Sequence, residues 1–308
     1  MHGHYAPNIK TNECDLLIAI GMRFDDRVTG RVSSYAKQAK VVHIEIDPSE
    51  INKIIHADFP ILGDAKKVLG QLLPKIKEAK HDEWIVGFKE CYKIEFEKVI
   101  KKDLHRNNGK NTMGEVVHRI SEATKGKAII VTDVGQHQMI AARYSGFAQT
   151  RSFVTSGGLG TMGFGLPAAV GAQLGKPERT VVTFIGDGGF QMTLQELGTI
   201  AQENIPVKIV ILNNHFLGMV RQWQELFFEK RYSFTEIKSP DFVALANAYG
   251  IKASRVSASS ELNGSIDEML THKGPYLLEV IVEKEDNVFP MVPSGSSVSE
   301  VILEKPDA

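Results

Sequence analysis

The chain has 308 residues, of which 43% are hydrophobic and 24% are charged, enough apolar material for two globular domains of ordinary size. Its 36 lysine and arginine residues nearly balance 37 aspartate and glutamate residues, and the net charge of −1 gives no electrostatic reason to expect nucleic acid or an anionic membrane as partner. No apolar run is long enough to cross a bilayer, the first ten residues lack a signal-peptide core, and only 2 cysteines occur, which favours the reducing cytoplasm.

The first part of the chain combines strand patterns with a helix pattern. Residues 15–21 and 40–48 contain apolar runs typical of buried strands, and residues 64–77 have apolar side chains at helical spacing. Residues 81–110 are charged and weakly patterned, so we expect a linker there. Residues 1–80 therefore form one expected domain in front of this linker.

The second part, residues 111–285, alternates between strand and helix patterns, which is typical of an α/β fold with a parallel sheet. Thr112 with Glu115, and Thr193 with Glu196, have the spacing of capping boxes that begin helices. A C-terminal tail, residues 286–308, completes the chain. Strands are expected at residues 127–134, 152–155, 179–185 and 207–212, each followed by a polar or glycine-containing loop.

Two of these strands are followed by side chains that suit a cation. Asp187 and Asn214 each come just after a strand, and parallel strands present their ligand-binding loops at one edge of the sheet. If the strands are neighbours, their tips lie roughly 5 Å apart. Mg²⁺ prefers oxygen ligands and often completes its shell with phosphate oxygens and water. Gly186, Gly188 and Gly189 leave the backbone open for a diphosphate to approach.

Taken alone, Gly-Asp-Gly-Gly is most often a turn, and Asn-Asn is an ordinary loop. Their combination is more specific, because 24 residues with a strand–helix–strand pattern separate Gly186-Asp187-Gly188 from Asn213-Asn214. This arrangement resembles the thiamine diphosphate signature of the transketolase and pyruvate decarboxylase superfamily. The resemblance implies that Mg²⁺ is bound by Asp187, by Asn214 and by the main-chain carbonyl of Phe216.

The same resemblance implies a thiamine diphosphate site. His137 by itself would more often be a polar loop residue, and Met162 by itself would more often fill a core. In the family, the apolar residue at the position of Met162 holds the cofactor in a bent shape. The implied cofactor positions are Val134, Gly135, Gln136, His137, Gly160, Met162, Gly186, Asp187, Gly188, Gly189, Asn214, Phe216, Leu217, Gly218 and Met219.

Three further stretches resemble the acetolactate (acetohydroxyacid) synthase catalytic subunit. The first combines Met-His-Gly at residues 1–3 with Ile-Gly-Met-Arg-Phe-Asp-Asp-Arg-Val-Thr-Gly at residues 20–30. The second is Leu-Gly-Met-Val-Arg-Gln-Trp-Gln at residues 217–224, and the third is Asn-Val-Phe-Pro-Met-Val-Pro-Ser-Gly at residues 287–295, similar to the family's C-terminal active-site tail. The similarity covers nearly the whole chain and is least distinctive in residues 81–110.

This resemblance implies a central FAD-binding domain of Rossmann-like α/β type, of which residues 1–80 are the latter part. FAD has a structural rather than a redox part in the family's main reaction. The segments implied to contact it run from residue 2 to 23 and from residue 45 to 64. The implied positions are His2, Gly3, Gly21, Arg23, Asp25, Glu45, Ile46, Gly63 and Asp64.

The substrates implied are pyruvate and 2-ketobutyrate. In the family, pyruvate is decarboxylated on thiamine diphosphate, and the hydroxyethyl carbanion condenses with a second 2-keto acid to give 2-acetolactate or 2-aceto-2-hydroxybutyrate, in branched-chain amino acid biosynthesis. Arg27 matches the arginine that receives the second carboxylate, although a salt bridge with Asp25 or Asp26 is the alternative. Met219 and Trp223 lie four residues apart and so share a helical face, where such a pair is ordinarily part of a core. They match residues that line the family's substrate pocket, in which the indole favours 2-ketobutyrate over pyruvate as the acceptor.

The sequence departs from the family in one respect. The family's catalytic glutamate lies in an N-terminal pyrimidine-binding domain, and no such domain is recognised here, so we expect the chain to be inactive alone. The resemblance also implies a homodimer or tetramer and a separate regulatory small subunit. Two alternatives stay open: a non-catalytic fragment that binds Mg²⁺ and diphosphate, and another FAD-containing thiamine enzyme such as pyruvate oxidase or glyoxylate carboligase.

Overall fold

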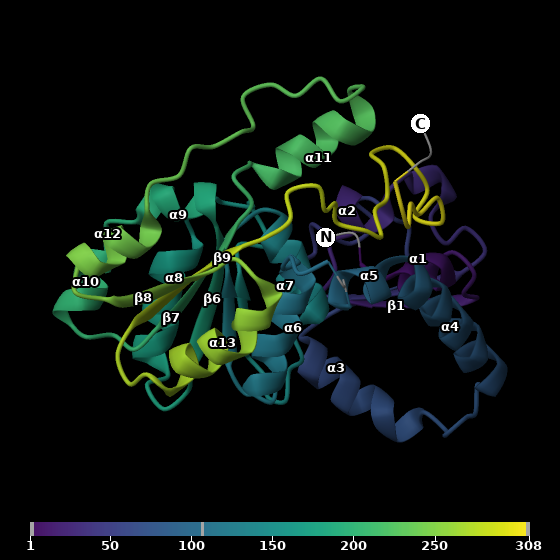
Figure 1. The fold of residues 1–308 in the computed structure, drawn as a ribbon. Coiled ribbons are helices and arrows are strands. Elements are labelled where there is room, and N and C mark those ends of the chain that lie inside the picture. Colours follow the sequence, from purple (N-terminus) through teal and green to yellow (C-terminus); the bar gives the residue numbers. More distant parts are fainter. Residues whose placement is uncertain (1–2, 106–107, 306–308) are drawn as a thin grey trace. The chain divides into compact units, whose positions relative to one another are not determined.

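The chain forms two units in the computed structural model, which describes residues 3–105 and 108–305 (Figure 1). Unit 1 consists of Met1–Ile100 with Phe289–Ala308, and unit 2 consists of Lys101–Val288. The C-terminal segment after Val288 therefore belongs to the same unit as the N-terminal part of the chain. Within the described ranges, no helix is both long and apolar enough to span a membrane.

Unit 2 contains a six-stranded sheet in which every neighbouring pair is parallel, with the order β5-β4-β6-β7-β9-β8. This confirms the α/β fold with a parallel sheet. The strands are β4 (Ile129–Thr132), β5 (Phe153–Thr155), β6 (Val181–Gly186), β7 (Lys208–Asn213), β8 (Lys252–Val256) and β9 (Tyr276–Ile281).

Helices cover both faces of this sheet (Figure 1). One face carries α6 (Met113–Ala123), α7 (Gln136–Tyr144) and α13 (Leu262–Thr271). The other face carries α8 (Gly165–Gly175), α9 (Asp187–Thr193), α10 (Glu196–Gln202) and α12 (Phe242–Ala248), which form an apolar core with the strands. Because both faces are covered, β6 and β7 are nearly continuous apolar runs rather than alternating ones. Helix α11 (Gly218–Phe227) follows β7, and the short η4 (Ser259–Glu261) precedes α13.

The strand order places a switch point between β4 and β6. After β4 the chain crosses to β5 at the edge of the sheet, and it then returns to form β6 on the other side of β4. The loops that follow β4 and β6 therefore lead away from each other at the carboxyl edge. In open α/β sheets such a divergence opens a crevice for a ligand.

Unit 1 contains a three-stranded parallel sheet with the order β1-β2-β3. The sequence predicts β1 (Leu16–Ile20) and β2 (Lys40–Glu45) but not β3 (Phe59–Leu62). Pro60 made β3 hard to predict, because proline has no N–H to donate within a sheet. The structure accommodates this proline because β3 is an edge strand. The other elements are α1 (Tyr5–Thr11), α2 (Asp26–Thr29), η1 (Val32–Ser34), α3 (Ala65–Leu72) and η2 (Leu73–Lys75).

The linker expected at residues 81–110 is largely helical. It forms α4 (Asp82–Glu95), the π-helical turn η3 (Phe96–Ile100) and α5 (Lys101–Leu104). The segment is not a solvated connection, because Glu95 is fully buried, accepts a hydrogen bond from the Tyr5 amide at 2.8 Å and contacts Nδ1 of His4 at 2.8 Å. From the sequence alone, Glu95 cannot be distinguished from a charged residue at the surface, because its partners lie on another helix or beside it.

The two expected capping boxes differ in outcome. Thr112 caps α6 and accepts a hydrogen bond from the Glu115 amide at 3.0 Å. Thr193 instead ends α9 and donates to the carbonyl of Gly163 at 3.0 Å, while α10 begins at Glu196 without a side-chain cap. The second capping box is therefore wrong, because the hydroxyl of Thr193 satisfies a loop carbonyl.

Strand β1 exposes an apolar face. Leu16, Ile18 and Ile20 are 48%, 48% and 42% exposed, whereas Ala19 between them is buried. The alternation is that of a strand covered on one face only.

The core of unit 2 depends on an aromatic contact between α9 and α12. Phe190 and Phe242 are fully buried, and their rings meet edge to face with centroids 5.3 Å apart. Replacing Phe242 with alanine removes this contact and leaves a cavity, so we expect the free energy of unfolding to fall by about 3–5 kcal/mol. Urea titration followed by circular dichroism measures it. Phe234→Ala, at a side chain that is 100% exposed, is the matched control, and equal losses in both variants would contradict this account of the core.

Candidate functional site

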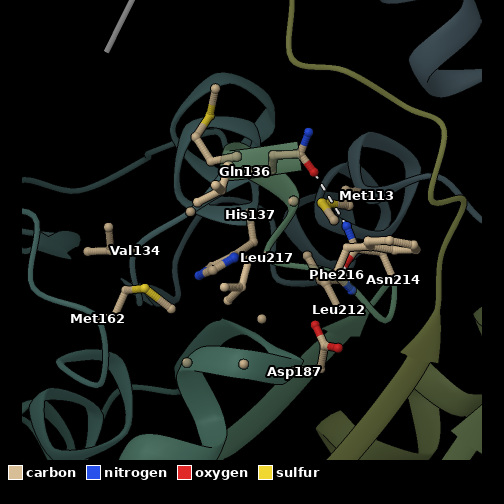
Figure 2. Close-up of a pocket in the computed structure, with 17 residues that line it drawn as sticks. Met113, Val134, Gln136, His137, Met162, Asp187, Leu212, Asn214, Phe216 and Leu217 are labelled. Atoms are coloured by element: carbon tan, nitrogen blue, oxygen red, sulfur yellow. Dashed lines mark hydrogen bonds between the residues drawn. The ribbon is translucent and has the colours of Figure 1, made fainter. Parts of the chain in front are cut away.

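A cavity of about 440 Å³ lies at the carboxyl ends of β4, β6 and β7 in unit 2 (Figure 2). Of the 15 positions that the resemblance implies for thiamine diphosphate, 14 line this cavity, and Gly160 does not. Three further residues complete the lining without having been predicted, namely Met113, Leu212 and Val220. The structure thus brings together residues from four separate sequence stretches, whose roles as ligands remain predictions.

Asp187 and Asn214 reach the cavity from neighbouring strands. Asp187 is the first residue of α9, directly after β6, and Asn214 directly follows β7, which pairs with β6 up to Gly186 opposite Leu212. Both side chains are buried, and Figure 2 shows them facing the same cavity. Burial raises the pKa of Asp187 to about 6, although Oγ of Ser239 donates to its Oδ2 at 3.2 Å. A buried carboxylate of this kind gains much from a cation partner.

The expected cation ligands contain one carboxylate only. Accordingly, in residues 3–105 and 108–305 no group of three or more His, Cys, Asp or Glu side chains is arranged to hold a metal ion. Asp187, an oxygen of Asn214 and the carbonyl of Phe216 would form an incomplete oxygen shell for Mg²⁺. This donor set suits an ion that takes its remaining ligands from a diphosphate and water.

Three helices begin at this cavity. Gln136, Asp187 and Gly218 are the first residues of α7, α9 and α11, and all three line the cavity. Unpaired backbone N–H groups and the helix dipole make each N-terminus favourable for negative charge. Their convergence suits an anion with several oxygens, such as a diphosphate.

His137 has a buried ring atom that lacks a partner. Its Nε2 has no hydrogen bond within the described structure, and burial lowers the pKa of the imidazole to about 3, so the ring is neutral. The ring also packs against Gly186, where an added Cβ would lie 2.9 Å from Nδ1 of His137. An unpaired nitrogen in the lining of the cavity fits a bound polar group.

Asp133, which was not predicted as a site residue, connects the loops around the site. It is fully buried directly after β4, and its Oδ1 accepts from the Gly165 amide at 3.2 Å. Gly189 approaches so closely that a Cβ there would lie 1.8 Å from Oδ2 of Asp133. The sequence could have indicated Asp133, because it is a polar residue between a buried strand and Val-Gly-Gln-His at residues 134–137. No pattern indicated Met113, because it belongs to α6, which is distant in the sequence from the other lining residues.

The two substrate-pocket residues predicted on α11 line different cavities. Met219 lines the 440 Å³ cavity, whereas Trp223 lines a second one of about 700 Å³ with Gln224, Phe228 and Arg231. Val220 lines both, so the two cavities adjoin. The ring of Trp223 also packs on Phe227, with centroids 4.9 Å apart.

Arg27 lies in unit 1, beside a cavity of about 390 Å³ that also contains Asp26 and residues 292–295 of the C-terminal tail. Its Nε is 3.9 Å from Oδ2 of Asp26, and the side chains are 54% and 82% exposed. Such a long, exposed ion pair contributes little to the stability of the fold. Arg27 thus forms the salt bridge with Asp26 that was the alternative, but this contact leaves the guanidinium accessible.

The positions implied for FAD lie in unit 1, except that His2 falls outside the described residues. Gly21, Glu45 and Gly63 follow or end the three parallel strands, so they share one edge of the sheet. Glu45 accepts from the Ile46 amide at 2.8 Å. Asp64 caps α3, and Asp25 caps α2 and accepts from Nε of Arg23 at 3.2 Å. Gly3 has a positive φ of 69° before α1.

Comparisons with known proteins agree with these features. Residues 133–280 match the thiamine pyrophosphate enzyme, C-terminal TPP binding domain, and residues 1–72 match the thiamine pyrophosphate enzyme, central domain. The chain is 44% identical to the acetolactate synthase isozyme 2 large subunit of Escherichia coli, over 99% of the chain and 54% of that protein. It is 42% identical to the mitochondrial acetolactate synthase catalytic subunit of Saccharomyces cerevisiae, over 100% of the chain and 46% of that protein.

A third relative is the acetolactate synthase large subunit of Lactococcus lactis, which is 44% identical over 98% of the chain and 52% of that protein. The chain therefore spans about half the length of the relatives it matches.

Gly218 offers a test of the cavity's geometry. A Cβ there would lie 2.2 Å from Oε1 of Gln136 and 2.8 Å from Nδ2 of Asn214. Because both amides would have to move, we expect Gly218→Ala to weaken binding of thiamine diphosphate in the presence of Mg²⁺ by about tenfold or more, measured by calorimetric titration.

The matched control is Gly264→Ala in α13, where nothing lies within 4 Å of the added Cβ. We expect this variant to bind as the unchanged chain does and to be more stable by up to about 1 kcal/mol. Unchanged affinity in the Gly218 variant would show that Gln136 and Asn214 do not hold the ligand.

Proposed function

We propose that this chain, which is homologous to acetolactate synthase large subunits and carries the central and C-terminal domains of thiamine pyrophosphate enzymes, binds thiamine diphosphate through Mg²⁺ in the 440 Å³ cavity. The observation that carries the proposal is that Asp187 and Asn214 enter one cavity from adjacent parallel strands. The N-termini of three helices surround the same space, which suits the charge of a diphosphate.

The residues present would divide the work of binding. Asp187, Asn214 and the carbonyl of Phe216 would hold Mg²⁺. Gly186, Gly188 and Gly189 lack the Cβ atoms that would collide with His137, Ile237 and Asp133, so these side chains pack closely against the backbone beside the cavity. His137, neutral and with Nε2 unpaired, would bind a polar group of the cofactor. Met162, an apolar lining residue, would support the thiamine rings. When bound, thiamine diphosphate supplies an electron sink for decarboxylation of a 2-keto acid.

The reaction proposed is that of acetolactate synthase. Pyruvate would lose CO₂, and its two-carbon unit would join a second pyruvate or 2-ketobutyrate to give 2-acetolactate or 2-aceto-2-hydroxybutyrate. Met219 and Trp223 on α11 would contact the substrates, and the accessible guanidinium of Arg27 suits a carboxylate. The mainly apolar lining would limit the access of water to the reacting atoms.

FAD would bind at the carboxyl edge of the β1-β2-β3 sheet in unit 1. Gly21, Glu45 and Gly63 stand at three adjacent strand ends there, the place where α/β sheets bind nucleotides. We further propose a homodimer or tetramer with a regulatory small subunit, on the strength of the similarity to large and catalytic subunits.

The metal site is tested by Asp187→Asn. This variant keeps the size of the side chain and removes its charge, so we expect the Mg²⁺-dependent affinity for thiamine diphosphate to fall by about tenfold to a hundredfold. Calorimetric titration of the chain with and without Mg²⁺ measures the change. Asp267→Asn, at an exposed position of α13, is the control. Equal affinity in both variants would refute the proposed site.

The substrate role of α11 is tested by Trp223→Leu in an active acetolactate synthase that contains this sequence. Loss of the indole should lower the yield of 2-aceto-2-hydroxybutyrate relative to 2-acetolactate by about tenfold, because a changed apolar contact alters discrimination by about 1–3 kcal/mol. The ratio is measured by chromatography with both keto acids present. The second tryptophan, Trp84, packs on Phe88 in unit 1, and Trp84→Leu is the control. An unchanged product ratio would count against this assignment.

A further inference from the structure

Two buried glutamine side chains lie behind the metal-binding edge of unit 2. Gln222 is fully buried in α11, and Gln136 is buried at the start of α7. Nε2 of Gln136 donates to Oε1 of Gln222 at 3.0 Å. Gln136 lines the 440 Å³ cavity, whereas Gln222 is not among the lining residues. Any effect of Gln222 on a ligand must therefore pass through another residue.

The backbone of Val288 fixes the orientation of the Gln222 amide. The amide N–H of Val288 donates to Oε1 of Gln222 at 2.8 Å, and Nε2 of Gln222 donates to the carbonyl of Val288 at 3.1 Å. A backbone N–H can only donate and a carbonyl can only accept. If the amide were rotated by 180°, its nitrogen would face the N–H of Val288 and its oxygen would face the carbonyl of Val288. Only one orientation of Gln222 therefore satisfies both bonds.

This orientation is passed on to Gln136. Because Oε1 of Gln222 is an acceptor, the group of Gln136 that faces it must be the donor Nε2, which also donates to the carbonyl of Asp286 at 3.2 Å. Oε1 of Gln136 is thereby directed to the other side, where it accepts from Nδ2 of Asn214 at 3.4 Å. Figure 2 shows this last hydrogen bond as a dashed line between Gln136 and Asn214.

The series ends at the oxygen of Asn214. With Nδ2 directed to Gln136, Oδ1 of Asn214 faces away and accepts from the Phe216 amide at 3.1 Å. An amide oxygen has a second lone pair, which is what a cation requires, whereas a reversed amide would present hydrogens to it. The Val288 backbone therefore sets the amide of Gln222, and the Asp286 carbonyl and the Phe216 amide favour the same orientations of Gln136 and Asn214 that Gln222 requires.

We propose that Gln222 is a positioning residue that, through Gln136, keeps the amide oxygen of Asn214 directed to the cation. The series Val288, Gln222, Gln136 and Asn214 is called the amide relay. This inference rests on the proposed function, since it assigns Asn214 to the metal. Gln222 lies outside the cavity and has no charge, so it would influence metal affinity through its hydrogen bonds alone.

The relay is tested by Mg²⁺ titration of the whole chain at saturating thiamine diphosphate. Gln222→Met keeps the length of the side chain but has no amide, so we expect the dissociation constant for Mg²⁺ to rise about tenfold. Gln222→Asn, whose shorter amide does not span both partners, is the second disruptive variant if the methionine variant unfolds. Gln222→Glu keeps an acceptor for Gln136 and for the Val288 amide, and we expect its dissociation constant to stay within about threefold of the unchanged value.

The matched control is Gln224→Met, two residues further along α11. Nε2 of Gln224 donates to the carbonyl of Ser233 at 3.0 Å, outside the relay, and we expect no change in Mg²⁺ affinity. If Gln222 acts only by anchoring the segment after β9, Arg221→Met, which removes the bonds of Arg221 to Lys284 and Glu285 in that segment but no bond of the relay, should weaken Mg²⁺ binding as much as Gln222→Met, which would overturn the relay. Unchanged affinity in the folded methionine or asparagine variant would overturn it as well.

Asp187→Asn separates this inference from the proposed function. If Asp187→Asn loses Mg²⁺ affinity while the Gln222 variants keep it, the metal site stands and the relay fails. If Asp187→Asn binds Mg²⁺ and thiamine diphosphate normally, the proposed site itself is wrong.

Discussion

The parallel pairing of β6 with β7 is the constraint on which the site depends. Parallel strands end at the same edge, about 5 Å apart, so the residues that follow them are neighbours although 27 positions separate Asp187 from Asn214. A shift of one residue in register would turn every side chain of a strand to the opposite face. Because both faces of β6 and β7 pack against helices, such a shift would disrupt the core. The apolar core thus fixes the positions of two polar side chains that contribute nothing to it.

The site contains several polar side chains that are buried, where polar groups contribute little to the stability of the fold. Asp133, His137, Asp187 and Asn214 are all buried, and burial raises the pKa of both carboxyl groups and lowers that of the imidazole. Nε2 of His137 is buried without a hydrogen bond in the described part of the chain, and the loss of hydration at such an atom is a cost to folding. The same lack of hydration strengthens any interaction with a bound cation or phosphate. Perturbed ionisation of this kind is typical of functional sites.

Much of the fold and site was predictable because the relevant signals are local. Each strand of unit 2 that leads to the cavity is a short apolar run, and Asp187 and Asn214 directly follow two of them. What escaped prediction depends on distant partners. Glu95 resembles a surface charge until α1 packs on it, and Pro60 conceals a strand that only its edge position permits. Trp223 shares a helical face with Met219 by spacing, but the structure assigns the two side chains to adjoining cavities.

Helix α11 shows why its polar residues were the hardest to interpret. Met219 lines the cavity, whereas Arg221 and Gln222 are buried away from it and bind the segment that follows β9. Arg221 donates to the carbonyl of Lys284 at 3.2 Å and to Oε2 of Glu285 at 2.9 Å, while Gln222 holds Val288. A helix that lines a ligand cavity needs a fixed rotation about its axis.

Apolar packing alone tolerates small rotations, because dispersion contacts are non-directional, whereas hydrogen bonds are directional. The buried polar residues of α11 therefore specify its rotation, which places Met219 at the cavity and directs the amide relay toward Asn214. The attachment of the segment that follows β9 and the orientation of a metal ligand are, in this structure, consequences of the same few hydrogen bonds.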